Sequence, residues 1–174
     1  MLFRSTTVTR IPLATAGLAA LLLAAAALYL TRLAYVPPYL MQDEVNFSLQ
    51  AHAIASTARD TNQRLLPLYF SETGFEAGRD PVMIHWTALF LTATPLSISS
   101  VRFPTALLAV LTIALMHMVA STLFSSHRTG LFAAALLAVT PGFFTNARLA
   151  LSIVYGIPVI TFWLYCLDRE LDSR

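Results

Sequence analysis

Residues 11–31 form a run of apolar and weakly polar side chains that contains no charge. A helix needs about 20 such residues to cross the hydrocarbon core of a membrane. The alternative is a signal peptide cleaved at the small residues 24–27, but the apolar core of a signal peptide is usually only about 7–15 residues long. The length of the run therefore favours an uncleaved membrane anchor.

Three further apolar runs indicate a polytopic membrane protein. Of the 174 residues, 57% are hydrophobic and 11% are charged, whereas roughly a quarter of an average soluble domain is charged. We predict an all-α fold with about four transmembrane helices, in a single membrane domain over residues 1–174, and we expect Pro104 in the first turn of its helix. The expected spans are 11–31, 104–124, 131–145 and 149–167, and the long outer loop is 33–103.

Charged residues in the short polar segments set the expected orientation. Arg4, Arg128 and Arg169 fall on one side of the four spans, and arginine in short loops prefers the cytoplasmic side. We predict a multi-pass protein of a bacterial inner membrane with both termini in the cytoplasm. All 11 basic residues are arginine and the net charge is only +2, a pattern that excludes a nucleic-acid partner. The one cysteine, Cys166, excludes an internal disulfide and a cysteine-based zinc site.

The outer loop is too apolar to be a flexible tether. Residues 42–60 follow a helical pattern whose apolar strip contains Val45 and Leu49, as in a helix that lies on a membrane surface or against the other spans. Residues 81–99 are again apolar but contain Pro95, which indicates a juxtamembrane or re-entrant helix rather than a span. Two apolar helices outside the bilayer indicate that a site is formed there.

Asp43 and Glu44 are candidate catalytic carboxylates at the expected start of the 42–60 helix. An acidic pair at this position can simply cap the helix and complement its dipole. The functional alternative is a general base at the membrane surface. Because adjacent helical residues point about 100° apart, only one of the pair can face a given site. Together with Asp80, the pair could hold a divalent metal if the fold brings the three carboxylates together; no other cofactor is indicated.

Five further residues are candidates for substrate binding. Arg102 and Arg148 fall at the outer membrane boundary, where they either extend to lipid headgroups or bind the phosphate group of a lipid substrate. Arg79 and Asp80 form either a solvated turn or a charged wall of the same site. His85 either anchors the chain at the interface or hydrogen-bonds a substrate.

Five strings of residues, taken in order, resemble the N-terminal part of the GT-C membrane glycosyltransferases. This group contains the protein O-mannosyltransferases and the aminoarabinose transferase of lipid A. The matching strings are QDEVNF at 42–47, LLPLY at 65–69, DPVMIHW at 80–86, VRFPTAL at 101–107 and NARLAL at 146–151. The resemblance covers roughly residues 33–165.

The resemblance implies an enzyme that moves a sugar from a polyprenyl-phosphate carrier to an acceptor on the outer face of the membrane. Asp43 would deprotonate the acceptor hydroxyl for a single inverting displacement, and Glu44 would be a supporting acid. Arg102 or Arg148 would hold the carrier phosphate. The implied partners are the lipid-linked sugar donor and membrane lipids.

The sequence departs from the family pattern at two positions and in length. Ser152 stands where family members often place an acidic residue, and Asp80 stands where they place a lysine, with Arg79 one position earlier. Family enzymes also have more spans than the four expected here. We therefore expect an N-terminal fragment, a split gene product or a degenerate paralogue, or an oligomer in which a second chain, identical or different, supplies the missing helices.

Two other functions stay open at this stage. One is a non-catalytic scaffold or lipid-binding subunit with the same fold. The other is a fragment of a transporter, suggested by the several helices and the interruption at Pro95. A transporter more often places ionisable groups near the middle of the membrane, whereas the informative residues here cluster in the outer loop.

Overall fold

The computed structural model describes residues 13–72, 75–79 and 81–172. Most of the described residues are helical, and β-structure is limited to one short antiparallel hairpin between two of the helices. The all-α fold class is therefore confirmed. In chain order the elements are α1 (Leu13–Leu30), α2 (Gln42–Thr57), β1 (Phe70–Glu72), β2 (Phe75–Arg79), α3 (Pro81–Leu91), α4 (Ile98–Leu123), α5 (His127–Val139), α6 (Pro141–Ala147), the 3-10 helix η1 (Ser152–Val154) and α7 (Gly156–Asp172).

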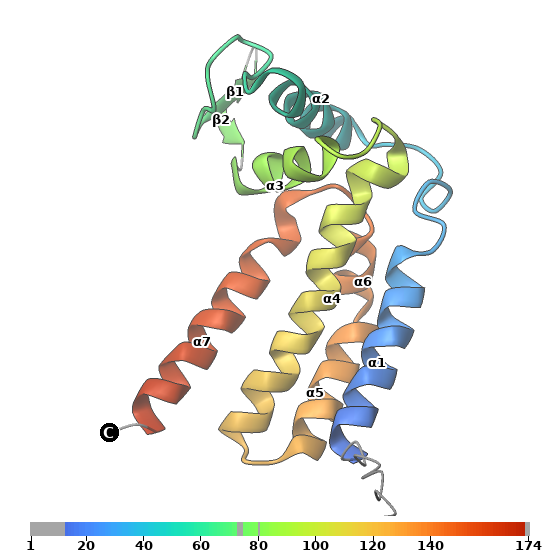
Figure 1. Ribbon diagram of the computed structural model, residues 1–174, viewed down its shortest axis with the longest axis vertical. Helices are drawn as coiled ribbons and strands as arrows, with labels where there is room; N and C mark the ends of the chain where they lie inside the picture. The colour runs from blue at the N-terminus through green and yellow to red at the C-terminus, as the bar shows by residue number, and fades with distance from the viewer. Residues whose placement is uncertain (1–12, 73–74, 80, 173–174) are drawn as a thin grey trace, which may run out of the picture.

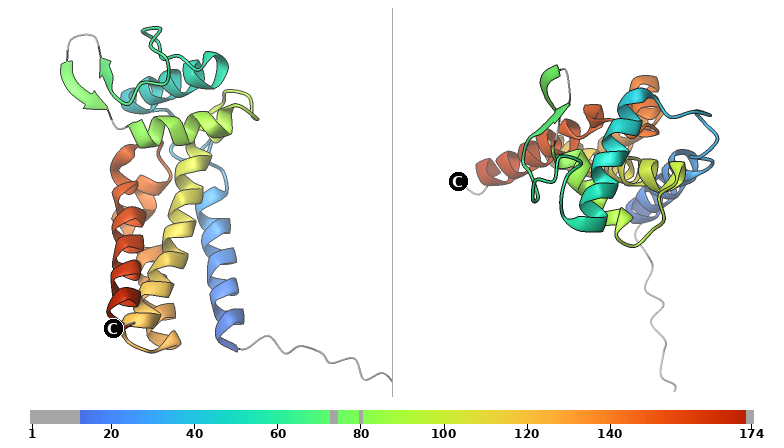
Figure 2. Two further views of the ribbon diagram at one scale, coloured as in Figure 1. Left: turned by 60° about the vertical axis from the view of Figure 1, so that its left-hand side comes forward. Right: turned by 90° about the horizontal axis from the view of Figure 1, so that it is seen from above.

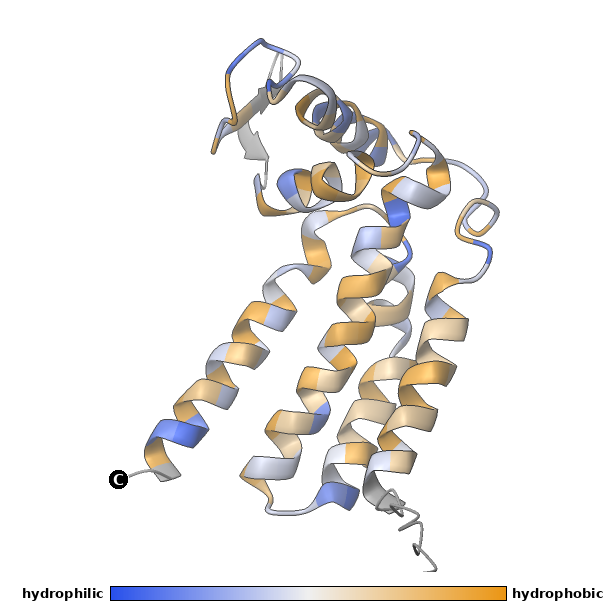
Figure 3. Cartoon of the chain, viewed as in Figure 1, coloured by the Kyte–Doolittle hydropathy of each residue, from blue (hydrophilic) through white to orange (hydrophobic). Residues whose placement is uncertain are grey.

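The helices form a bundle with a layer across one of its ends. Helices α1, α4, α5 and α7 run alongside one another, while α2, α3 and the hairpin lie across the end of this bundle (Figures 1 and 2). Apolar residues predominate along the bundle helices, and hydrophilic residues gather towards their ends (Figure 3). The crossing layer is the region predicted as the outer loop, and we call it the outer layer.

Membrane-spanning capacity is clearest in α4. Within the described ranges, α4 is the one helix that is by itself both long and apolar enough to cross a membrane. Helices α5 and α6 pass the same test as a pair, but they are bent by 63° relative to each other. The described residues of α1 and of α3 form shorter apolar helices. The number of four crossings stays a prediction.

The helices of the bundle differ in their bounds from the predicted spans, most clearly for 104–124 and 149–167. Helix α4 begins at Ile98 because Ser97 caps it, with Ser97 Oγ accepting the Ser100 N–H at 3.2 Å. Pro104 therefore lies inside α4 and not in its first turn. In the 149–167 span, the helix begins only at Gly156. Before it, Leu149, Ala150, Leu151 and Val154 are buried in the core, while Ile153 is exposed.

One face of α2 is buried against the rest of the chain. The buried residues of α2 are Glu44, Phe47, Ser48, Ala51 and Ile54, which follow one another at helical spacing. Phe47, Ala51 and Ile54 join the hydrophobic core together with the buried apolar residues of α3. Val45 and Leu49 of the predicted apolar strip are exposed, so they face away from this core. The physical reason is the ion pair that Glu44 makes beneath the helix.

Candidate functional site

A buried ion pair lies at the junction of the outer layer and the bundle. Glu44 of α2 and Arg102 of α4 are both 0% exposed. Arg102 Nε donates to Glu44 Oε1 at 2.8 Å, and Arg102 Nη2 donates to Glu44 Oε2 at 2.9 Å. Two parallel hydrogen bonds between planar groups fix both the distance and the orientation of the partners. The pair therefore holds the first turn of α2 in a defined place on α4.

The remaining donors of Arg102 bind the backbone between α1 and α2. Nη1 donates to the carbonyls of Leu33 at 3.0 Å and Pro37 at 2.6 Å, and Nη2 donates to the carbonyl of Tyr39 at 2.9 Å. With the two bonds to Glu44, all five N–H groups of the guanidinium have acceptors. The predicted role of Arg102 in binding a phosphate stays a prediction, and in this structure its donors are engaged within the chain.

The Glu44 carboxylate has two backbone partners besides Arg102. Oε1 accepts the Ala150 N–H at 2.9 Å, and Oε2 accepts the Met41 N–H at 3.0 Å, which completes a capping box at the start of α2. Burial by itself raises the pKa of Glu44, but the hydrogen bonds from Arg102, Ala150 and Met41 lower it below its ordinary value. Glu44 is thus a fixed anion, an arrangement that favours a structural role over that of a supporting acid.

Asp43 occupies the opposite environment from its neighbour. It lies in the first turn of α2 and is exposed, while Glu44 is fully buried. The prediction that only one of the two carboxylates can face a given site agrees with this arrangement. Because Glu44 anchors the helix start, the position of Asp43 at the outer surface is set by the same contacts.

Arg148 forms a second attachment of the segment that follows α1. It is 5% exposed and follows α6 directly. Nη1 donates to the carbonyls of Leu28 at 2.7 Å and Tyr29 at 3.1 Å, and Nη2 donates to those of Thr31 at 2.8 Å and Val36 at 3.1 Å. Carbonyls in the last turn of a helix lack partners within the helix, and a cation there also complements the helix dipole. Its predicted role in phosphate binding likewise stays a prediction.

The other predicted site residues lie around the start of α3. His85 Nε2 is 3.0 Å from the carbonyl oxygen of Pro67, a contact that attaches α3 to the loop before β1. Arg79 is the last residue of β2, and Asp80 lies outside the described residues. Among the residues that the structure describes, no group of three His, Cys, Asp or Glu could hold a metal ion.

Two adjoining apolar hollows extend from His85 into the bundle. The first, of about 440 Å³, is lined by Leu68, Pro81, Val82, His85, Trp86 and Leu89. The second, of about 340 Å³, lies between α3, α4 and α7 and shares Val82 and Trp86 with the first. Its other lining residues are Leu108, Leu115, Tyr155, Pro158, Val159 and Phe162. We call the two together the α4–α7 groove.

The sequence interpretation included a capping role for Glu44 but missed its ion pair with Arg102 and the backbone contacts of Arg102 and Arg148. Arg102 and Arg148 each lie beside an apolar run of the sequence, and such a run tends to be buried. A buried charge requires a partner within the protein, so these positions indicated an internal contact. The helical spacing of Glu44, Phe47 and Ala51 carried a second signal. What the sequence did not supply was the pairing itself, since Glu44 and Arg102 are far apart in the chain.

A comparison with protein families gives one match. The sequence model described as dolichyl-phosphate-mannose-protein mannosyltransferase matches residues 79–173, which is more than half of the 174 residues. His85, Arg102 and Arg148 lie inside the matched range, and Asp43 precedes it. No curated protein and no solved structure matches the chain.

Proposed function

Because the chain belongs to the dolichyl-phosphate-mannose-protein mannosyltransferase family, a group of GT-C membrane glycosyltransferases, we propose that it takes part in sugar transfer from a polyprenyl-phosphate donor. The acceptor is a hydroxyl group at the outer face of a bacterial inner membrane. Both termini are then cytoplasmic, and the outer layer faces the acceptor. The observation that carries the proposal is the pair of adjacent carboxylates, one locked in the core and one presented at the surface.

Asp43 is the proposed general base. The acceptor hydroxyl gives its proton to the Asp43 carboxylate while its oxygen bonds to the anomeric carbon of the sugar. The bond between that carbon and the carrier phosphate oxygen breaks, and the phosphate leaves with the electron pair. A phosphate is a good leaving group, so the base supplies most of the catalytic assistance. The support for this assignment is the exposure of Asp43 on a helix start that Glu44 holds in place.

The α4–α7 groove is the proposed place for the isoprenoid chain of the donor. Its walls are almost entirely apolar, and it begins at His85 on the outer layer and continues between two bundle helices. Arg79 and His85 are proposed to bind the sugar phosphate, and Asp80 is proposed to belong to the wall of the same site. This arrangement would let the isoprenoid chain of the donor stay in apolar surroundings while its phosphate remains at the membrane surface.

The test is release and transfer of the sugar from a synthetic polyprenyl-phosphate mannose in membranes that contain the chain. Membranes with the wild type should transfer more sugar than membranes without it, and Asp43→Asn should reduce transfer to the background. Arg128→Gln, an exposed change at the opposite end of the bundle, is the matched control and should keep the wild-type rate. Transfer at background level by the wild type contradicts the proposal. Retained binding of the donor in that case would favour the scaffold or lipid-binding function instead.

A further inference from the structure

Two histidines lie side by side at the end of the bundle opposite the outer layer. His117 lies near the end of α4, and His127 is the first residue of α5. The two helices meet at this end in Figures 1 and 2. The centroids of the two imidazole rings are 5.7 Å apart, and their planes are inclined by 24°. The short connection between α4 and α5 therefore brings two imidazoles from different helices together.

Gly130 allows this close approach of α5 to α4. It is buried, and a Cβ added there would clash with Ser121 Oγ and lie 2.7 Å from the carbonyl oxygen of His117. Residues three positions apart are neighbours on one face of a helix, so His127 lies on the same face of α5 as Gly130. The tight packing at Gly130 thus places His127 beside His117.

One nitrogen of this histidine pair is buried without a partner. His117 is 6% exposed, and its Nδ1 has no hydrogen-bond partner among the residues that the structure describes. Its Nε2 lies 3.3 Å from Ser121 Oγ. When Nε2 carries the proton and donates to this hydroxyl, the lone pair of Nδ1 is left unused. A buried polar atom without a partner destabilises the folded chain, so this position favours a ligand that binds the lone pair.

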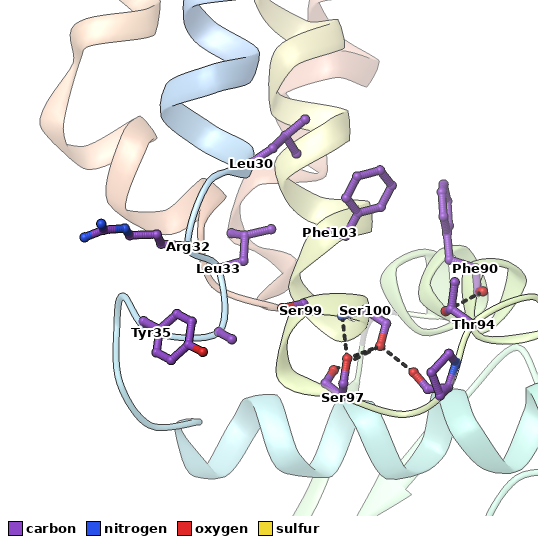
Figure 4. Close-up of a pocket in the computed structure, with 12 residues that line it drawn as sticks. Leu30, Arg32, Leu33, Tyr35, Phe90, Thr94, Ser97, Ser99, Ser100 and Phe103 are labelled. Carbon is purple, nitrogen blue, oxygen red and sulfur yellow. Dashed lines mark hydrogen bonds between the residues drawn. The ribbon is translucent and has the colours of Figure 1, made fainter.

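The hydroxyl groups at the other end of the bundle show the opposite case. A hollow of about 610 Å³ beside the start of α4 is lined by several of them. Ser100 Oγ donates to the carbonyl oxygen of Pro95 and lies 2.6 Å from Ser97 Oγ (Figure 4). The Thr94 hydroxyl donates to a backbone carbonyl in the same way. These groups are bound within the chain, whereas Nδ1 of His117 is not.

We propose that His117 Nδ1 and His127 bind a divalent transition-metal ion of the Zn²⁺ class. Imidazole suits such ions, whereas Mg²⁺ and Ca²⁺ prefer oxygen ligands. With Zn–N distances of about 2.0–2.1 Å and tetrahedral geometry, the centroids of two ligating imidazoles lie roughly 5 Å apart, close to the observed 5.7 Å. His127 is exposed, so its ring can turn a nitrogen toward the ion without displacing a packed neighbour. Water occupies the remaining positions.

The surroundings of the pair are compatible with a bound cation. In the tautomer described above, Ser121 Oγ accepts the Nε2 proton of His117, and a hydrogen bond of this kind orients a metal-ligating histidine. The end of α4 carries a partial negative charge and the start of α5 a partial positive one, so the two helix dipoles offset each other here. The ion joins α4 to α5, and the site is separate from the proposed transfer reaction.

The test is the binding of Zn²⁺ to the purified full chain in detergent, measured by isothermal titration calorimetry. The parent chain carries an affinity tag without histidine and the substitution Cys166→Ser, because the exposed thiol of Cys166 is itself able to bind Zn²⁺. We expect one Zn²⁺ per chain and a higher Tm with Zn²⁺ than without it. Mg²⁺ at the same concentration should bind to neither histidine and leave Tm unchanged.

The variants remove one imidazole at a time. His127→Gln acts at an exposed position and should weaken Zn²⁺ binding at least tenfold, with a zinc-free Tm within about 2 °C of the parent. His117→Gln should weaken binding to a similar extent. His52→Gln is the matched control, because it removes an exposed histidine from α2, and its affinity should stay within twofold of the parent.

The outcomes either assign the ion to the α4–α5 connection or overturn the site. A loss of binding in His127→Gln with His52→Gln unchanged assigns it, even when His117→Gln does not fold. The proposal is overturned when the parent binds no Zn²⁺, or when His127→Gln binds it within twofold of the parent. An equal loss in His52→Gln means an adventitious ion only and overturns it too. Asp43→Asn should keep Zn²⁺ binding, so a failure of the transfer proposal stays distinguishable.

Discussion

Arg102→Met removes the cation of the buried pair while it keeps a long apolar side chain in the same place. Glu44 then becomes an enclosed anion without its bidentate partner, and loss of one partner from a buried pair costs about 3–5 kcal/mol. The carbonyls of Leu33, Pro37 and Tyr39 lose donors as well. Each buried carbonyl that water does not reach adds about 1–3 kcal/mol.

The expected loss in the free energy of unfolding is thus about 4 kcal/mol or more, against a total that is typically about 5–15 kcal/mol. For a chain of this size, 1 kcal/mol corresponds to about 2–4 °C in the midpoint Tm, so Tm should fall by at least about 8–16 °C. Thermal unfolding of the purified chain in detergent, followed by circular dichroism, measures this shift. The double variant Glu44→Gln/Arg102→Met contains no buried charge at this site and should have a higher Tm than Arg102→Met alone.

Two results would refute this reasoning. One is a Tm for Arg102→Met that equals that of the wild type, and the other is a double variant less stable than Arg102→Met.

The pH dependence of the wild-type Tm gives a further check. Although burial raises the pKa of Glu44, its hydrogen bonds lower it overall from 4.5. The stabilisation by the Glu44 anion in the wild type is therefore complete above pH 4.5 and is lost as the pH falls through the lower folded value, so the wild-type Tm should fall in that acidic range.

Two further predictions concern the outer layer and the topology. Burial raises the pKa of Asp60, but hydrogen bonds from Arg64 and Asn62 and the charge of Arg64 lower it below 3.8 overall. Because the Asp60 anion stabilises the folded chain, Asp60→Asn should lower Tm near pH 7. This difference in Tm between Asp60→Asn and the wild type should disappear as the pH falls through the folded pKa of Asp60. A Tm deficit that is as large at the lowest pH at which the wild type stays folded as it is at pH 7 would contradict this. In a Cys166→Ser background, Asn62→Cys should react with a membrane-impermeant maleimide added outside intact cells, and Arg128→Cys should react only after the membrane is opened. The opposite labelling pattern would reverse the proposed orientation.

The sequence predicts the helices of this chain better than their surroundings. The start of α2 at Gln42 follows from local chemistry, since acidic residues favour a helix N-terminus. The bundle helices follow from long apolar runs. Both are properties of residues close together in the chain, so no knowledge of the fold is needed to predict them.

The contacts between distant segments could not be predicted in the same way. Glu44 turns the buried face of α2 toward Arg102, and a strip that contains Val45 and Leu49 is left outside. Residues 149–151 are as apolar as a membrane span, but they are buried at the edge of the bundle before α7, with the Ala150 N–H bound to Glu44. Apolar composition alone does not distinguish a lipid-facing helix from a buried connection.

The exposed apolar face of α7 bears on the prediction of an oligomer. Val159, Ile160, Phe162 and Trp163 are all exposed on this helix. In a membrane such residues can face lipid or a further helix. The expectation that a second chain supplies additional helices stays a prediction, and cross-linking in native membranes would measure it.

The central claim is that Asp43 reacts while Glu44 holds the structure. The most direct measurement is the sugar-transfer rate per mole of folded protein for Asp43→Asn, with Tm recorded on the same sample. The account predicts a rate at least about 100-fold below wild type, the lower end of the range for loss of a general base, with a Tm at most a few degrees lower, because Asp43 also complements the dipole of α2. A rate within twofold of wild type in folded Asp43→Asn would contradict it.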